Sequence, residues 1–353
     1  MALKLGLNLG YWGIGPRGDE ALDLVRTAER AGFDSVWVAE SYGSDVVSVL
    51  AWLAPQTETI KLGAAIMQVP ARPPAAAAMA GCTIDALSDG RFIFGFGPSG
   101  PQVSEGWYGV PYAKPWGRTR EYVELVREIV AREGKLDHQG EHYRLPLEGG
   151  EGKALKLNFH PLRNEIPVFL GAIGRKSVEL AAEIADGWIP IFFSADAFEE
   201  TWGEHLAAGF ERGGRDRRDL EVSPSISVAI DGDVETALSV VRGSLLLYLG
   251  GMGSEKTNFY ADLAGRFGFE AEAAEVQALF LAGEREKAYD AIPDELVAAT
   301  SLVGSEDDVA ERVERFAAAG VDRLIASPVH VDAAERQHTI ERLAARVGAA
   351  SPA

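Results

Sequence analysis

The chain has 353 residues, of which 47% are hydrophobic and 25% charged, and this composition is typical of a globular protein with a large buried core. Lys and Arg number 34 against 53 Asp and Glu, and the resulting net charge of −19 argues against nucleic acid as a partner. Cys82 is the only cysteine, which excludes an internal disulfide and a cysteine-based zinc site. We expect its thiol to be buried and unreactive.

Membrane insertion and export are not indicated by the sequence. No apolar stretch approaches the roughly 20 residues that a membrane-spanning helix needs. The first residues form too short an apolar run for a signal peptide, and they predict a strand instead. We therefore expect a cytoplasmic protein with no membrane partner.

Short apolar runs alternate with amphipathic helical stretches along most of the chain. The expected strands cover residues 4–10, 34–40, 60–69, 91–97, 167–174, 186–192, 220–230 and 321–329. The expected helices cover about 18–32, 46–54, 73–90, 117–133, 175–185, 195–212, 233–247 and 305–319, with a last one at the C-terminus. Two helices end in the similar phrases RAGFD and AAGVD, where Gly32 and Gly320 suit a left-handed cap.

Eight strand–helix units predict an α/β fold. Strands that are apolar over their whole length indicate a parallel sheet buried on both faces, and eight of them can close into a (β/α)8 TIM barrel. A doubly wound open sheet is the alternative. We predict one domain over residues 1–353, with insertion segments at about 98–116, 134–166 and 250–300 near the C-terminal mouth. Barrel enzymes build their sites from the loops at that mouth.

Several familiar motifs are missing from the sequence. No Rossmann or P-loop fingerprint, no HExxH and no GxSxG occurs, and GFGPSG has the wrong spacing for a nucleotide loop. We expect no metal site, because the six histidines are scattered. His138 and His142 share a hairpin-like stretch, where a surface position is the simpler interpretation than metal binding.

Two strand-end loops have features of a binding site. In residues 171–176, Gly174 directly precedes a helix, and Arg175 and Lys176 follow it, an arrangement that suits a phosphate group. Many helices begin in this way without a ligand, so the pattern alone leaves both possibilities open. The loop 97–102 offers backbone freedom and few side chains, which suits either a flat ring lying against the main chain or a simple tight turn.

Four segments together resemble one family. They are LGAAIMQVPARPP, ALSDGRFIFGFGPSGPQVSEGWYGVPY, LGAIGRKSVELAAEIADGW and YLGGMGSEKTNFY. In this order they resemble the luciferase-like oxidoreductases, and most of all the branch that uses the deazaflavin coenzyme F420. The resemblance runs from about residue 3 to 330. It implies a bacterial-luciferase-like barrel, and a homodimer.

The resemblance also implies a cofactor site. In this family the third strand ends in a bulge with a non-prolyl cis peptide bond, which here would join Ala65 and Ile66. The positions that match the ring and ribityl segment or the phosphate cradle are Ala65, Ile66, Met67, Gly97, Pro98, Ser99, Gly100, Pro101, Gln102, Ala172, Ile173, Gly174 and Arg175.

The chemistry implied is the transfer of a hydride between C5 of the deazaflavin and a small organic substrate, at a CH–OH, C=C or C=N group. Glu40, Ser41 and Glu105 are the groups that we expect to move a proton, although a solvated loop carboxylate is the simpler interpretation of Glu105. The aromatic residues expected to face a substrate are Tyr11, Tyr42, Trp107 and Tyr108.

One activity of the family is not expected here. Its sugar-phosphate dehydrogenases carry a histidine directly after the acid at position 40 and a glutamate near position 99 or 100, whereas this chain has Ser41 and no such glutamate. A glucose-6-phosphate dehydrogenase is therefore disfavoured. Two other functions stay open: an FMN-dependent luciferase-like monooxygenase, and a barrel that binds a flavin or deazaflavin without catalysis.

Overall fold

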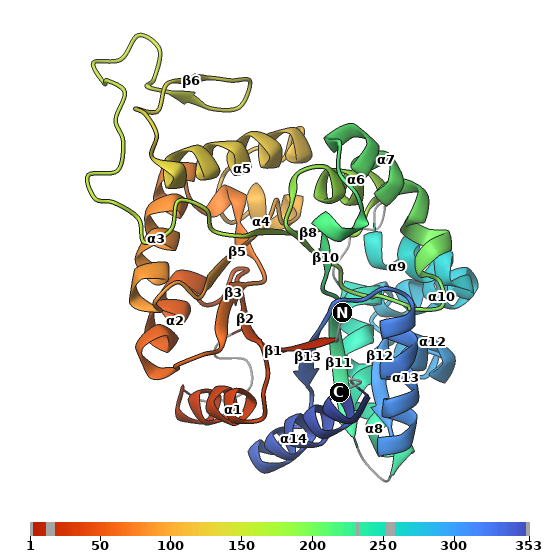
Figure 1. Cartoon of the computed structure of the whole chain (residues 1–353). Helices are drawn as coiled ribbons and strands as arrows, with labels where there is room; N and C mark the ends of the chain where they lie inside the picture. Colours follow the sequence, from red (N-terminus) through yellow and green to blue (C-terminus); the bar gives the residue numbers. More distant parts are fainter. Residues whose placement is uncertain (1–2, 12–17, 231–232, 252–257, 351–353) are drawn as a thin grey trace.

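The computed structural model describes residues 3–11, 18–230, 233–251 and 258–350, and these residues form a parallel barrel inside a ring of helices (Figure 1). The main strands are β1 (Lys4–Tyr11), β2 (Ser35–Ala39), β3 (Lys61–Ala64), β5 (Phe92–Gly97), β8 (Val168–Gly171), β9 (Gly187–Ile189), β10 (Glu221–Val222), β11 (Ser225–Ile230) and β13 (Arg323–Pro328). Each of them pairs in parallel with its neighbours.

The seventh strand closes the ring. β10 pairs with β9, and β11, which starts after a break of two residues, pairs with β13, which in turn pairs with β1. A bridge between Ile191 and Ser225 links β9 directly to the start of β11. The sheet therefore returns to its first strand. This confirms the predicted TIM barrel and rules out the open sheet.

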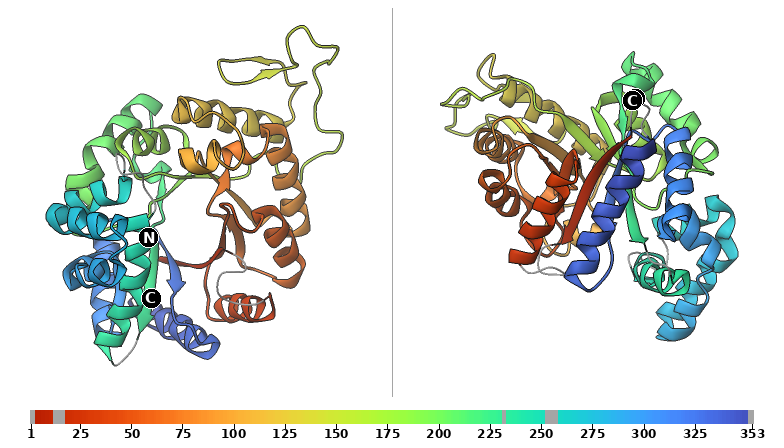
Figure 2. Two further views of the ribbon diagram at one scale, coloured as in Figure 1. Left: turned by 180° about the vertical axis from the view of Figure 1, so that it is seen from behind. Right: turned by 60° about the horizontal axis from the view of Figure 1, so that its bottom comes forward.

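The helices cover the outside of the sheet, as both views of Figure 2 show. Their bounds are α1 (Gly18–Arg30), α2 (Val46–Leu53), α3 (Pro74–Leu87), α5 (Pro115–Ala131), α6 (Arg175–Ile184), α7 (Glu204–Gly213), α8 (Val234–Leu246), α13 (Glu306–Ala318) and α14 (Ala333–Ala350). Gly32 and Gly320, which follow α1 and α13, both have φ of 88°. The left-handed caps predicted at these two glycines are therefore confirmed.

Besides the strand expected over 220–230, which is broken into β10 and β11, two expected elements differ from the structure. The stretch 60–69 is not one strand, because the chain turns after β3 and resumes as the short β4 (Met67–Gln68), which pairs with β5. The helix expected over 195–212 begins only at residue 199. Its first turn is a π-helical turn, η3 (Glu199–Gly203), which leads into α7. Four short helical turns lie between the main elements up to β10. They are η1 (Ala54–Gln56), η2 (Val69–Ala71), α4 (Pro101–Ser104) and η4 (Arg217–Asp219).

A further strand, β12 (Ser301–Gly304), is missing from the sequence-based expectations. It pairs in parallel with β11, on the edge opposite to β13. A run of four residues between two helices is too short to show the alternation by which a strand is recognised, so only its pairing identifies it. The seventh strand thus forks, since β10 pairs with β9 and β11 pairs with β12 on the same side.

The predicted insertion segments contain short elements. Residues 134–166 include an antiparallel hairpin, β6 (His138–Gln139) and β7 (Arg144–Leu145), which projects from the barrel in Figure 1. The described part of 250–300 is helical and lies outside the barrel beside β11 and β12 (Figure 1). Its turns and helices are η5 (Leu247–Gly251), α9 (Phe259–Ala264), η6 (Gly265–Phe269), α10 (Glu270–Leu281), α11 (Arg285–Asp290) and α12 (Asp294–Ala299). Among the described helices, none is both long and apolar enough to span a membrane.

The inside of the barrel has a small core of its own. Its buried members are Trp37, Ile93, Phe169, Ile189 and Ile325, and the partly buried Ala65 packs against them. Arg323, at the first position of β13, is 1% exposed and lies over the rings of Trp37 and Phe169. Arg323 also forms ion pairs with Asp34 and Glu221, which lie at the N-terminal ends of their strands. These three charged side chains therefore close the N-terminal end of the barrel, and Ala65 lies towards its C-terminal mouth.

Candidate functional site

The break between β3 and β4 brings three predicted segments together. The peptide bond between Ala65 and Ile66 is cis, which confirms the expectation drawn from the family resemblance. A Cβ added to Gly97 would lie 2.3 Å from Cδ1 of Ile66, and one added to Gly171 would lie 2.9 Å from its Cγ2. The Ile66 side chain therefore rests on two glycines at the ends of β5 and β8, where only a hydrogen leaves room for it.

Gln68, in β4, ties this break to the predicted ring-binding loop. Its Nε2 donates a hydrogen bond of 2.8 Å to the hydroxyl of Ser99, and the carbonyl of Ser99 accepts a 3.1 Å bond from the hydroxyl of Tyr112. Ser99 has φ of 61°, a left-handed conformation that is uncommon for serine, so these two bonds hold an otherwise disfavoured loop shape. Gln68 is 3% exposed, and its Oε1 has no hydrogen-bond partner among the described residues.

Glu40, expected to move a proton, is held by a buried arginine. Nη1 and Nη2 of Arg72 donate to its two carboxylate oxygens at 2.9 and 2.6 Å. Nη2 of Arg72 also donates to Asp45 at 2.8 Å. Burial alone would lower the pKa of Arg72, but the hydrogen bond and charge of Glu40, with the charge of Asp45, raise the pKa above its ordinary value.

The same carboxylate also organises the backbone around it. Glu40 is 6% exposed and accepts bonds from the backbone N–H groups of Gln68, at 3.0 Å, and Val46, at 3.4 Å. A carboxylate with both oxygens occupied is suited to fixing the loops after β2 and β4 rather than to carrying a proton. Arg72 was not among the expected site residues, because its pairing with a residue 32 positions away is not visible in the sequence.

The other expected proton carriers and the aromatic residues lie on neighbouring loops. The hydroxyl of Tyr108 donates a 3.3 Å bond to the carbonyl of Ser41, which joins the loop after β2 to the loop after α4. Burial is the main cause that raises the pKa of Tyr108. Tyr42 and Trp107 are exposed, at 64% and 65%.

Two further expectations concern the edges of this region. Glu105 is exposed and accepts a 2.9 Å bond from the backbone N–H of Tyr112, so one of its oxygens stabilises the loop. Tyr11 is the last residue of β1, and its side chain lies outside the part of the chain that the structure describes.

The predicted phosphate-binding turn is held from behind by two buried tryptophans. The indole N–H of Trp188 donates a 2.7 Å bond to the carbonyl of Ala172, and that of Trp202 donates a 3.2 Å bond to the carbonyl of Ile173. Both indoles are fully buried, and their rings lie 5.4 Å apart in an edge-to-face contact. Neither tryptophan was predicted, since nothing in the sequence distinguishes them from other buried aromatic residues.

The front of the turn is the start of α6. The carbonyl of Gly174 accepts bonds from the N–H groups of Ser177 and Val178, whereas those of Arg175 and Lys176 have no acceptor among the described residues. A Cβ added to Gly174 would meet nothing closer than the Ser177 hydroxyl, at 3.7 Å. The space in front of the helix is thus open, and both side chains that follow are exposed cations.

The remaining predicted positions are mostly backbone contributors. Met67, Pro98 and Ala172 are buried, and Gly97 is buried at the end of β5. Gly100 precedes α4, where Pro101 is the first residue and Gln102 is exposed. Among the described residues, no group of three or more His, Cys, Asp and Glu gathers as metal ligands would.

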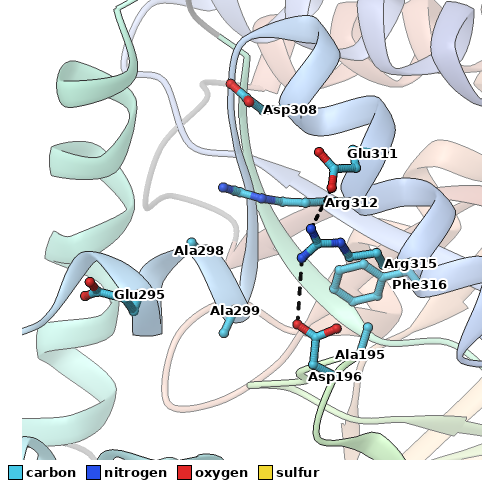
Figure 3. Close-up of a pocket in the computed structure, with 10 residues that line it drawn as sticks. All are labelled: Ala195, Asp196, Glu295, Ala298, Ala299, Asp308, Glu311, Arg312, Arg315 and Phe316. Atoms are coloured by element: carbon cyan, nitrogen blue, oxygen red, sulfur yellow. Dashed lines mark hydrogen bonds and ion pairs between the residues drawn. The ribbon is translucent and has the colours of Figure 1, made fainter.

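A separate hollow of about 320 Å³ lies between α12, α13 and the loop after β9 (Figure 3). Arg315 crosses it, paired with Glu311 and Asp196. Phe316 lines the hollow and contacts Phe193, whose ring stacks on Trp202 at 5.3 Å. None of the predicted site residues lines it, and the aromatic cluster separates it from the phosphate-binding turn.

Known proteins match this chain over most of its length. One relative is a protein of Mycobacterium tuberculosis that is provisionally named a coenzyme F420-dependent oxidoreductase. It is 48% identical to this chain over 329 residues, which cover 92% of this chain and 94% of the relative. The 5,10-methylenetetrahydromethanopterin reductase of Archaeoglobus fulgidus is 31% identical over 311 residues, 87% and 89% of the two chains.

The fold matches as well. The solved coenzyme F420-dependent tetrahydromethanopterin reductase of Methanopyrus kandleri superposes with a TM-score of 0.83 at 22% identity, and the match covers 98% of each chain. The model of the luciferase-like monooxygenase family matches residues 8–323. With its closed barrel and the two glycines at the strand ends of its mouth, the chain belongs to the luciferase-like monooxygenase family.

Proposed function

We propose that this protein is an oxidoreductase that binds coenzyme F420 and transfers a hydride to or from a small organic substrate. The Mycobacterium tuberculosis relative supports the choice of cofactor, since it is named for F420 and is 48% identical to this chain. The structural observation that carries the proposal is the packing of Ile66 on Gly97 and Gly171, which gives a flat ring an apolar surface at the ends of strands three, four and five of the barrel.

The orphaned oxygen of Gln68 tests whether a ring system fits there. A buried carbonyl oxygen without a donor costs about 1–3 kcal/mol, and a bound group that offers an N–H would remove this cost. The pyrimidine part of a deazaflavin carries such a ring N–H. Gln68 lies next to the cis peptide bond and bonds to Ser99, so a polar edge at this position would lie beside both predicted ring-binding segments.

The cofactor's phosphate would bind at the start of α6. The unpaired N–H groups of Arg175 and Lys176 point out of the helix terminus, where the helix dipole favours an anion. The indole bonds of Trp188 and Trp202 fix the two preceding peptide groups, so the turn needs no rearrangement to receive the ligand.

Each remaining side chain then has a role. When bound, the deazaflavin supplies a carbon centre that accepts or donates a hydride. The pair of Glu40 and Arg72 positions the loops after β2 and β4, and Ser41 or Glu105 moves any accompanying proton. The exposed rings of Tyr42 and Trp107 are suited to an apolar or aromatic part of the substrate.

Direct binding measurements test the cofactor. We expect the purified protein to bind F420 more tightly than FMN, followed by fluorescence of each cofactor. Micromolar binding of FMN without binding of F420 would transfer the assignment to a flavin monooxygenase. Tight binding of F420 with no turnover of any acceptor, followed at about 420 nm, the coenzyme's own absorption, would instead indicate a barrel without catalysis.

A charge placed at the phosphate-binding turn tests the mode of binding. Aspartate is a favoured residue before a helix, so Gly174→Asp should fold as well as the wild type. Its carboxylate would occupy the N–H groups and repel a phosphate, so we expect the dissociation constant for F420 to rise at least about tenfold. Gly174→Ala is the control, because a Cβ fits there, and it should bind normally. Equal affinities of the two variants would reject this turn as the phosphate site.

A further inference from the structure

The insertion helices reach the phosphate-binding turn through Trp202. The indole N–H of Trp202 donates to the carbonyl of Ile173 at 3.2 Å, and its ring meets the ring of Phe267 edge-to-face, with centroids 5.9 Å apart. Trp202 is fully buried, so it holds both partners in fixed positions. Phe267 belongs to η6 and directly follows Arg266. The segment that carries Arg266 therefore lies beside the turn, about 90 residues away along the chain.

Arg175, at the start of α6, is near enough to Arg266 for the two positive charges to influence each other. Arg266 is half-buried, and burial is the main cause that lowers its pKa, while the nearby charge of Arg175 lowers it further. The exposed Asp262 acts in the opposite direction. Neither guanidinium forms a hydrogen bond or an ion pair with another described residue.

Such an arrangement is unfavourable in the protein alone. Two guanidinium groups that repel each other, one of them partly removed from water, raise the free energy of the folded state unless an anion comes between them. Arginine is also the side chain best matched to a phosphate, because its planar group donates two parallel hydrogen bonds. The backbone N–H groups of Arg175 and Lys176, which have no acceptor among the described residues, lie at the same end of α6 as the Arg175 side chain.

We propose that Arg266, together with Arg175, binds the phosphate of the cofactor's tail, so that the insertion segment α9–η6 is part of the cofactor site. The identity of the cofactor rests on the proposed function. The presence of an anion site does not, because it follows from the two arginines. An anionic group of the substrate is the other source of the same chemistry, and the test separates the two.

The test compares ligands with and without the phosphate. Dissociation constants are measured by fluorescence for F420, for its riboflavin-level deazaflavin, which has the same ring but lacks the phosphate and the rest of the tail, and for the 5′-phosphate of that deazaflavin, which adds the phosphate alone. The 5′-phosphate should respond as F420 does. For Arg266→Gln we expect the constant for F420 to rise about tenfold, the loss of one charge-assisted contact, and the constant for the tail-less ligand to stay unchanged. Arg285→Gln, an exposed arginine in the same insertion, is the matched control and should change neither.

Each other outcome overturns the proposal. If Arg266→Gln weakens both ligands equally, Arg266 acts through the fold or the ring, and if it weakens neither, Arg266 serves a substrate anion or nothing. Added salt gives a second readout that needs no variant, since it should weaken binding of F420 to the wild type and leave the tail-less ligand unaffected. A salt response shared by both ligands would count against an anion site at Arg266.

The outcome remains distinguishable if the cofactor assignment fails. Should the wild type bind FMN and not F420, the same comparison is made with FMN and riboflavin, which differ in the same phosphate. A preference for FMN that Arg266→Gln removes would support the anion site under a different cofactor. A wild type that binds the phosphorylated and unphosphorylated ligands equally, in either pair, would overturn the site itself.

Discussion

Arg72 is the cation that pairs with the buried carboxylate of Glu40. Removing it would leave the Glu40 carboxylate buried with no cation, and breaking a buried pair in this way costs about 3–5 kcal/mol. We therefore expect Arg72→Ala to lower the free energy of unfolding in urea by about this amount. It should also weaken cofactor binding, because the backbone N–H of Gln68 donates a hydrogen bond to the same carboxylate.

An exposed pair provides the comparison. Arg218 and Asp216 also form an ion pair, but the Arg218 side chain is 87% exposed, and we expect no measurable change in stability for Arg218→Ala. If Arg72→Ala were as stable as Arg218→Ala, Glu40 would be better solvated than its 6% exposure suggests. Its expected role in proton transfer would then regain support.

For single residues, the sequence could predict roles that depend on neighbouring positions, but not roles that depend on contacts between distant segments. The position of the cis bond at Ala65 and Ile66 followed from a family resemblance, and the structure confirms it. Gln68 and Arg72 lie within the same quoted segment, yet their importance comes from a hydrogen bond to Ser99 and an ion pair with Glu40, both about 30 positions away. Only the parallel arrangement of strand ends brings these residues together.

Between neighbouring strands, two glycines of β5 should respond differently to the same substitution. A Cβ on Gly95 would lie 1.7 Å from the carbonyl oxygen of Ala64, which belongs to the backbone of β3 and cannot move alone. We expect Gly95→Ala to lower the free energy of unfolding by about 3 kcal/mol, the upper end of the usual cost of overpacking. Gly97→Ala would meet only the end of the Ile66 side chain, at 2.3 Å, which can rotate.

The two variants therefore separate stability from binding. Gly97→Ala should cost less stability than Gly95→Ala, but it should displace Ile66 from its place over the strand ends and weaken binding of the cofactor. Urea unfolding and cofactor titration of both variants measure the two effects. A Gly97→Ala variant with wild-type affinity would show that the Ile66 surface does not contact the ligand.

Glu29 connects α1 to the start of β3 and gives this connection a dependence on pH. Burial alone would raise the pKa of Glu29, but bonds from the backbone N–H groups of Ile60, Thr59 and Glu58 and from the hydroxyl of Thr59 hold it below 4.5. A depressed pKa stabilises the folded state above the ordinary value, and this contribution disappears as the pH falls through the folded-state value.

Replacing this carboxylate should remove that pH dependence. Glu29→Gln keeps an accepting oxygen but loses the charge, so we expect it to be less stable than the wild type at pH 7, with a difference that shrinks as the pH falls below about 4.5. Urea unfolding at several pH values measures this, with Glu314→Gln on the exposed face of α13 as the control. A difference that stays constant down to acid pH would contradict the assignment.

At the level of elements, the periodicity of apolar residues predicted most helices and strands of the barrel. It missed the strands that only backbone pairing with a neighbour defines. Apart from α7, which begins later than expected, the helices from α1 to α13 that cover the barrel begin and end close to their expected bounds, because an amphipathic stripe extends over several turns. β12 and β4 consist of four and two residues, which is too few for a pattern. They exist because neighbouring strands offer free backbone groups to bond with.

For the whole molecule, the sequence predicted the order of the units and the position of the mouth, since parallel strands place all their carboxyl ends together. The composition could not predict the interior. Arg323 lies inside the barrel although arginine is among the residues least often buried, and it is compensated by Asp34 and Glu221 from two other strands. The homodimer implied by the family stays a prediction, which light scattering of the purified protein would test.

The fork of the seventh strand has a consequence for how such a protein can change. β12 pairs with the edge of β11 beyond the point where β9 pairs with the seventh strand. The long segment between α8 and β12 therefore begins and ends outside the closed ring. The helices from α9 to α12 can therefore vary in length and charge while the eight-membered wall keeps its register. Substitutions around Arg266 can thus change the anion that this segment binds while the strand ends beneath Ile66 stay the same.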